Sequence, residues 1–170
     1  INTALLGFLH DGDHVVTTNL EHNSVLRPLY HLEHDDVCDV TYVPFDEKGF
    51  LDPADIKRAV KKNTKLVIVN HGSNVLGTVQ PLAEIGEICK KADVLFAVDA
   101  SQTAGAVPID VQAMQIDALA FTGHKCLMGP TGIGGSYCAE DLPIRATRYG
   151  GTGVRSAHRF HLDEFPYRLE

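Results

Sequence analysis

Two apolar runs of the chain end in polar residues that could act together on a carbonyl compound. The run at 94–99 ends in Asp99, and the run at 117–122 is followed, after one glycine, by His124 and Lys125. A lysine at the mouth of an apolar sheet can form a Schiff base, because desolvation lowers the pKa of its amine. A carboxylate suits a pyridinium nitrogen, and small polar groups with backbone amides suit a phosphate. Pyridoxal phosphate is a cofactor that needs this set of partners.

Polar residues also stand at two further points of the same kind. The run at 65–70 ends in Asn70 and leads to His71 and Asn74, and His22 stands just before a predicted helix. A buried acid and a buried lysine at neighbouring strand ends cost free energy unless they are used. The pattern by itself leaves plain alternatives open: a surface lysine, a turn-forming aspartate and capping side chains.

The elements that must position these residues alternate between strands and helices. Helices with readable starts lie between the runs: Asp52 and Pro53 begin one, Pro81 begins another, and Asn23 or Ser24 caps one that continues to about residue 31. Several runs are continuous Val/Ile/Leu stretches, typical of strands buried on both faces. The pattern predicts a three-layer α/β/α fold with a mostly parallel sheet. Right-handed crossovers should place the C-terminal end of every strand at one edge, where ligands of such sheets bind. The six predicted strands are 14–18, 39–44, 65–70, 94–99, 117–122 and 133–138.

Composition excludes several classes of protein. The chain has 170 residues, of which 44% are hydrophobic, and this is enough for one globular domain. With 15 Lys and Arg against 22 Asp and Glu, the net charge of −7 argues against nucleic-acid binding. We find no apolar run of about 18 residues that would span a membrane, and no secretory signal in the sequence given.

The cysteine and histidine patterns predict no metal site. The four cysteines are scattered without a CxxC motif, so we expect thiols, mostly buried, in a reducing and therefore cytoplasmic compartment. Two His/Asp clusters, at 10–14 and 31–36, resemble metal sites by composition. The first contains a turn signal before a strand, so its side chains would splay apart, and the second is better explained as a polar, solvated helix end.

Five sequence blocks resemble the class V aminotransferase family, in particular its cysteine desulfurase and selenocysteine lyase branch. The blocks stand in the family's order and run along essentially the whole chain: EHNSVLRP, HGSNVLGTVQP, VDASQTAG, FTGHKCLMGPTGIGG and YGGTGVRS. The resemblance implies the large domain of a fold-type I pyridoxal phosphate enzyme, which is aspartate aminotransferase-like.

The resemblance also implies catalytic roles for three residues. Lys125 would form the internal aldimine with pyridoxal phosphate. Asp99 would pair with the pyridine nitrogen and keep it protonated. His22 would stack on the ring and move protons to or from the substrate.

Five further residues are implied to bind the cofactor without taking part in the chemistry. Gln102 and Asn74 would donate to the phenolic oxygen of pyridoxal phosphate. Thr122 and His124 would hold its phosphate. Thr152, in the last block, would reach the phosphate of the neighbouring subunit in a homodimer.

The implied reaction is removal of sulfur from L-cysteine, which leaves L-alanine and an enzyme persulfide for a possible acceptor protein. Alternatives are another class V reaction, such as transamination, epimerisation or selenocysteine cleavage, and a non-catalytic interaction module. We expect residues 1–144 to be the central part of the large domain, and 145–170 to lead out of its core. The family's N-terminal phosphate loop and C-terminal small domain are expected outside this chain, so we expect this polypeptide alone to be inactive.

Overall fold

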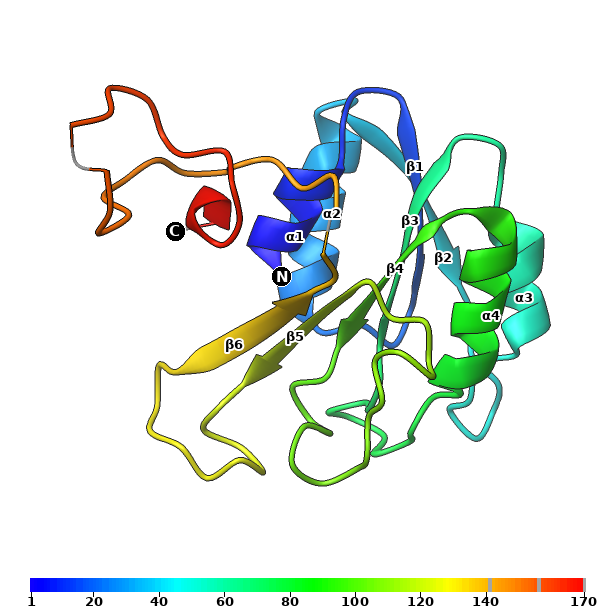
Figure 1. Cartoon of the computed structure of the whole chain (residues 1–170). Coiled ribbons are helices and arrows are strands. Elements are labelled where there is room, and N and C mark those ends of the chain that lie inside the picture. Colours follow the sequence, from blue (N-terminus) through cyan, green and yellow to red (C-terminus); the bar gives the residue numbers. More distant parts are fainter. Residues whose placement is uncertain (141, 156, 170) are drawn as a thin grey trace.

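The computed structural model describes residues 1–140, 142–155 and 157–169, and its centre is a sheet of six strands. The strand order is β2-β1-β3-β4-β5-β6; the first five strands run parallel, and β6 pairs antiparallel with β5. All six predicted strands are confirmed to within one residue at each end. Their bounds are β1 (Asp13–Thr18), β2 (Cys38–Val43), β3 (Thr64–Asn70), β4 (Leu95–Asp99), β5 (Ala118–Thr122) and β6 (Gly134–Cys138) (Figure 1).

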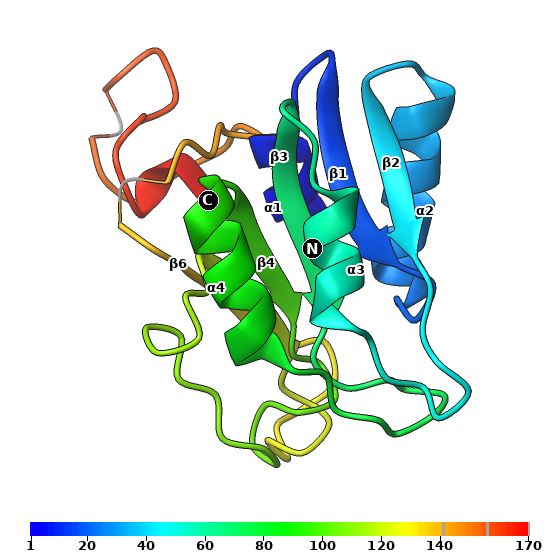
Figure 2. The same ribbon diagram turned by 90° about the vertical axis from the view of Figure 1, so that its right-hand side faces the viewer.

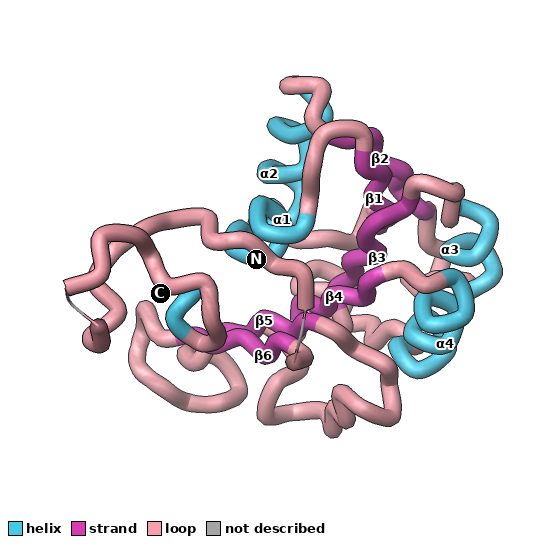
Figure 3. Tube along the Cα trace, turned by 45° about the horizontal axis from the view of Figure 1, so that its top comes forward, coloured by secondary structure: helices cyan, strands magenta, loops and turns pink. Residues whose placement is uncertain are grey.

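Helices cover both faces of the sheet and make it the middle of three layers. The helices α1 (Asn2–Phe8) and α2 (Asn23–His34) lie on one face, and α3 (Pro53–Ala59) and α4 (Leu82–Ala92) lie on the other (Figure 3). One 3₁₀ turn, η1 (Tyr167–Leu169), follows near the C-terminus. The predicted α/β/α architecture is therefore confirmed. Among the described residues, no helix is long and apolar enough to cross a membrane.

Alternating side chains of the central strands fill the two cores. On β3, Val67 and Val69 pack in the cluster that includes α3 and α4, whereas Leu66 and Ile68 pack in the cluster that includes α1 and α2. All four are fully buried. Because both faces are covered, the strand carries no polar alternation, and this is why it reads as an unbroken apolar run.

The helix starts follow from local capping, with two corrections. Asp52 caps α3 as predicted, since its Oδ1 accepts a hydrogen bond from the Ala54 N–H at 2.8 Å. The prediction that Asn23 or Ser24 caps α2 is wrong by one or two residues, because His22 is the N-cap of that helix. Pro81 precedes α4 as its N-cap residue instead of being its first helical residue.

The parallel strands all end at one edge of the sheet, where three long connections gather: residues 71–81, 100–117 and 123–133 (Figure 2, lower end). The expectation that every strand ends at this edge is wrong for β6. That strand runs in the opposite direction, so it begins there, with Gly134 beside Thr122. The connection that carries Lys125 therefore leaves the sheet and re-enters it at the same edge.

Candidate functional site

A cavity of about 400 Å³ opens at the edge where the parallel strands end. Seven of the eight predicted site residues line it, and only Thr152 does not. They come from the start of α2, from the ends of β4 and β5, and from the connections that follow β3, β4 and β5. The full lining is His22, Ser24, Asn70, Gly72, Asn74, Asp99, Ser101, Gln102, Thr122, His124 and Lys125.

Asp99 is a buried carboxylate in the wall of this cavity. It is the last residue of β4, lies beside Asn70 of β3 in the sheet register, and is 4% exposed. Its Oδ1 accepts a hydrogen bond from the Ser101 N–H at 2.9 Å. No salt bridge of the described residues involves Asp99. A buried carboxylate without a protein cation is suited to bind a cationic N–H group of a ligand.

Lys125 lies on the connection between β5 and β6, and this connection packs closely on itself. The Gly123 N–H donates to Ile133 O at 2.7 Å, and the Gly129 N–H donates to Gly123 O at 2.8 Å. A Cβ at Gly129 would lie only 3.0 Å from Gly123 O, so this close approach favours glycine. The loop therefore holds the half-buried lysine at the cavity from two fixed ends.

Two polar pairs complete the walls of the cavity. The hydroxyl of Thr122 and Nδ1 of His124 lie 2.7 Å apart, so the structure brings together the two predicted phosphate ligands. The Nδ1 atom of His22 accepts from the Ser24 N–H at 3.1 Å. Because Nδ1 is the acceptor, the neutral imidazole carries its proton on Nε2. Capping α2 thus fixes both the orientation of the ring and its tautomer.

Asn74 and Gln102 lie in tight turns that follow β3 and β4. The turn containing Asn74 is closed by two bonds, from the Ser73 N–H to Thr78 O and from the Gly77 N–H to Ser73 O, each 3.0 Å long. Gly77 has φ +74°, a conformation that favours glycine. The connection after β4, which contains Gln102, also packs on the lysine loop, since a Cβ at Gly105 would lie 2.9 Å from Leu127. Both predicted amides therefore lie on ordered turns at the cavity.

Sequence reasoning gave no role to two buried ionisable residues beside the cavity. Glu21 is 6% exposed, and burial raises the pKa of its carboxyl to about 8. His71 is 3% exposed, its Nδ1 lies 2.9 Å from the Thr103 hydroxyl, and burial lowers its pKa. Glu21 directly precedes His22, and His71 directly follows the last residue of β3. These positions in the sequence were the signal that could have indicated a role for them.

Comparison with known families is decisive at this point, because the family model described as "Aminotransferase class-V" matches residues 1–170. The chain belongs to the class V aminotransferase family. Cysteine desulfurase IscS of Dictyoglomus turgidum is 38% identical over 141 residues, which are 83% of this chain and 35% of that protein. Cysteine desulfurase IscS of Clostridium botulinum (strain Kyoto) is 40% identical over 154 residues, or 88% of this chain and 38% of that protein.

Solved structures show the same class V fold. The apo cysteine desulfurase of Thermococcus onnurineus NA1 superposes with a TM-score of 0.83 at 38% identity, covering 89% of this chain and 39% of that one. The structure "SspA in complex with cysteine" gives a TM-score of 0.84 at 33% identity, covering 88% of this chain and 44% of that one. The chain thus spans less than half the length of each of these relatives.

The residues around the cavity fit pyridoxal phosphate, the cofactor implied by the family. The cavity offers a primary amine from Lys125 and a buried carboxylate from Asp99, which suit an aldehyde and a ring nitrogen. The Thr122 and His124 pair offers donors for a phosphate. No group of three or more possible metal ligands is found among the described residues, and this holds for both His/Asp clusters noted in the sequence.

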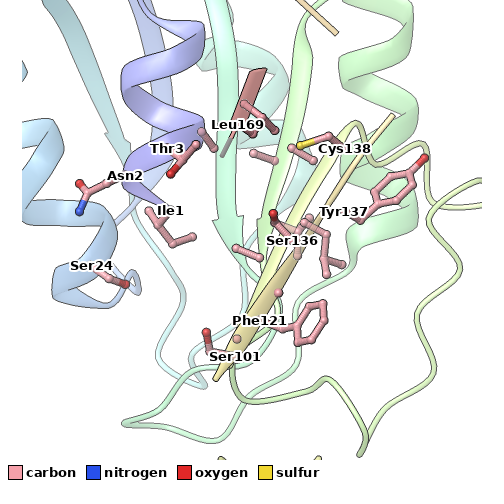
Figure 4. A pocket seen from close by; sticks show the side chains of 18 of the residues that line it. Ile1, Asn2, Thr3, Ser24, Ser101, Phe121, Ser136, Tyr137, Cys138 and Leu169 are labelled. Carbon is pink, nitrogen blue, oxygen red and sulfur yellow. The ribbon is translucent and has the colours of Figure 1, made fainter. Parts of the chain in front are cut away.

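A second cavity of this class V chain, about 500 Å³ in volume, adjoins the first one. It lies between the N-terminal end of α1 and the strands β5 and β6, with Ile1 and Thr3 on one side and Tyr137 and Cys138 on the other (Figure 4). Ser24, Ser101 and Thr122 line both cavities, so the two share a wall. The same face of the sheet therefore has an uncovered region directly beside the candidate site.

Thr152 lies away from the cavity. Its hydroxyl donates to Val154 O at 3.1 Å, within the segment that follows the core. Ser156, the last residue of the YGGTGVRS block, falls outside the described residues. The predicted reach of Thr152 into a neighbouring subunit stays a prediction.

All four cysteines are free thiols, and two of them are buried. Cys38 and Cys89 are buried, and burial raises their pKa values to about 11 and about 12. Cys138 is half-buried. Cys126 is exposed, because the loop after Lys125 directs its Sγ to Gln102 O, 3.8 Å away at the surface.

Proposed function

We propose that this chain is the cofactor-binding part of a pyridoxal-phosphate-dependent cysteine desulfurase. The observation that carries the proposal is the single cavity into which β3, β4, β5 and the start of α2 bring Lys125, Asp99 and His22. The substrate would be L-cysteine and the products L-alanine and a persulfide on an enzyme cysteine. The two relatives named cysteine desulfurase IscS, together with a structural neighbour that holds cysteine, support this choice of substrate.

Each side chain at the cavity would have a defined task. When bound, pyridoxal phosphate supplies a ring that stabilises negative charge at the substrate α-carbon. Lys125 would bind the aldehyde carbon and, once released from it, would take the α-proton. Asp99 would accept the N–H of the ring and keep that nitrogen protonated. His22, with its proton on Nε2, would stack on the ring and move a proton to or from the substrate.

The remaining lining residues would orient the cofactor. Thr122 and His124 would hold its phosphate, while Asn74 and Gln102 would donate to its phenolic oxygen. In the sulfur transfer, a protein thiolate would bond to the substrate sulfur as the C–S bond breaks. The electron pair of the broken bond would stay on carbon and bind the proton that the protein thiol gave up on ionising. Carbon is thereby reduced by two electrons and the two sulfurs together are oxidised by two, so no external oxidant is needed.

The proposed parent protein is longer than this chain, in line with the 35 to 38% of the two desulfurases that the chain spans. Residues 1–144 would be the central part of the large domain, and 145–170 would lead out of it. A segment preceding α1 would cover the cavity beside β5 and β6 and would carry the phosphate loop. A C-terminal small domain would supply the arginine for the substrate carboxylate and the sulfur-accepting cysteine.

A homodimer is the proposed assembly. Several apolar side chains are exposed on the connections around the cavity, including Val75 at 80%, Met128 at 91% and Ile133 at 55%. An apolar surface of this kind is typical of a protein contact. The dimer would also let Thr152 reach a phosphate across the interface. Free thiols at all four cysteines support a reducing, cytoplasmic compartment, where a sulfur-acceptor protein would receive the persulfide.

The test is alanine release from L-cysteine by the full-length parent supplied with pyridoxal phosphate. Borohydride reduction followed by peptide mapping should place the cofactor on Lys125. An adduct on Lys90 or Lys91, which lie on the far side of the sheet in α4, would contradict the assignment of the site. Cofactor binding without alanine release would retain the site and reject the desulfurase reaction.

A further inference from the structure

Glu21 is buried next to the cavity without a cationic partner. It is 6% exposed, and its Oε1 accepts hydrogen bonds from the Thr18 hydroxyl at 2.8 Å and the Asn70 N–H at 2.9 Å. Its other oxygen, Oε2, is buried and has no hydrogen-bond partner. An ionised carboxylate in this position would leave a full negative charge half-satisfied in the protein interior, at a large cost in free energy.

Asn70 also has a buried side-chain oxygen without a hydrogen-bond donor. It is 3% exposed, its Nδ2 donates to Leu20 O, and its Oδ1 is buried without a donor. The bond to Leu20 fixes the orientation of the amide, because a flipped amide would place two acceptors against each other. In the described part of the chain, Oε2 of Glu21 and Oδ1 of Asn70 are the two buried side-chain oxygens that lack a donor. They belong to side chains already joined through the Asn70 N–H.

We propose that Glu21 is held as a neutral carboxylic acid whose Oε2–H is donated to Asn70 Oδ1, and that this bond positions His22 and Asn70 in the cavity wall. A single proton, bonded to Glu21 Oε2 and donated to Asn70 Oδ1, then gives both of these buried oxygens a hydrogen-bond partner. Glu21 does not line the cavity, so it is a positioning residue that acts through its neighbours. This role rests on the function proposed above, whereas the protonation state of Glu21 does not.

The charged groups around Glu21 favour the neutral form. Asp99, at the end of β4, is the charged group that acts on it, and its negative charge opposes a second one nearby. Thr18 on β1 and Asn70 on β3 are uncharged. His22 follows in the chain but turns its Nδ1 to Ser24, so it offers Glu21 no bond from that nitrogen. With Glu21 neutral, Asp99 keeps its place as the buried anion of the proposed cofactor site.

Difference infrared spectroscopy tests the protonation state directly, on the full-length protein without cofactor. Wild type minus Glu21→Gln should show the C=O band of a protonated carboxyl at about pH 6, and this band should disappear as the pH rises past about 9. The exposed Glu47, changed to Gln, is the matched control and should show no such band. Absence of the band at the lower pH overturns the proposal.

Stability and cofactor retention test the consequence. Glutamine can accept from the same donors through its oxygen and donate to Asn70 through its amide, so it mimics the neutral acid. The denaturation midpoint of the wild type should fall relative to Glu21→Gln as the pH rises from about 6 to about 9. A midpoint difference that does not change with pH overturns the proposal.

Glu21→Ala leaves the donors of Thr18 and Asn70 empty, and a cofactor affinity at least about tenfold weaker than that of Glu21→Gln is expected. Equal affinities of these two variants, read from the visible absorbance of bound cofactor, would show that Glu21 does not position the site. Loss of cofactor binding by every form, with the infrared band intact, would reject the proposed function alone.

Discussion

Asp99 is the residue proposed to keep the ring nitrogen of the cofactor protonated. Asp99→Asn should leave the fold intact, because the amide is nearly isosteric and can still accept from the Ser101 N–H. It should slow turnover by roughly 10²-fold or more, since a neutral amide does not keep a ring nitrogen protonated. Steady-state alanine release by the full-length enzyme measures this, and wild-type turnover in the variant would remove Asp99 from its role.

His14, like Glu21, is a buried residue whose hydrogen bonds depend on pH. Its ring bridges three strands, with Nδ1 2.8 Å from the Thr64 hydroxyl and Nε2 2.8 Å from the Thr41 hydroxyl. Burial, and secondarily the charge of Lys61, lower its pKa below 6.5. A lowered folded-state pKa means that the unfolded chain binds the proton first, so the stabilising contribution is present above pH 6.5 and is lost as the pH falls through the folded pKa.

Urea unfolding measured between about pH 7 and pH 5 should therefore show the free energy of unfolding falling by up to roughly 1.4 kcal/mol per pH unit for this proton. His14→Gln should be less stable at neutral pH but should show a shallower fall. His34→Gln, at the exposed end of α2, is the control and should retain the wild-type slope. An unchanged slope in His14→Gln would contradict the assignment.

At the scale of elements, the packing of α4 depends on one glycine. A Cβ at Gly86 would lie 2.0 Å from Met114 O, in the turn before β5. Alanine favours a helix over glycine by about 1 kcal/mol, but this overlap with backbone forces α4 or the turn to move. Gly86→Ala should therefore destabilise the protein by roughly 1–3 kcal/mol in chemical denaturation. Gly150→Ala, with no atom within 4 Å of its Cβ, should change stability little.

The elements also show what sequence patterns can and cannot predict. Continuous apolar runs predicted the central strands β1, β3 and β4, because burial on both faces leaves a local signature. The polar residues next to the predicted elements, together with the family resemblance, predicted seven residues of the cavity. The reversed direction of β6 was not predicted, although β5 and β6 are consecutive strands with no helix between them, and a parallel pair needs a crossover connection. The cap formed by His22 was missed because imidazole is not a preferred N-cap group. Glu21 was missed because its role depends on Asn70, 49 residues away.

At the scale of the whole molecule, the cavity lacks a group that the proposed reaction requires. No arginine is among the described residues that line it, and Arg148 lines only the adjoining cavity. The adjoining 500 Å³ cavity also leaves one side of the site uncovered. Residues 1–170 alone should therefore not release alanine from L-cysteine with added pyridoxal phosphate, in contrast to the full-length parent. Turnover within about tenfold of the parent, a barrier difference of only about 1.4 kcal/mol, would contradict this.

The reversal of β6 has a consequence for how the lysine meets its partner. The loop after β5 re-enters the sheet at the edge it left, and hydrogen bonds near its two ends join Gly123 to Ile133 and to Gly129. A side chain on such a doubly anchored loop samples a small volume, so the amine of Lys125 is presented to the cavity at a high effective concentration. Folding has therefore already restricted the positions of the Lys125 amine before a carbonyl compound enters the cavity.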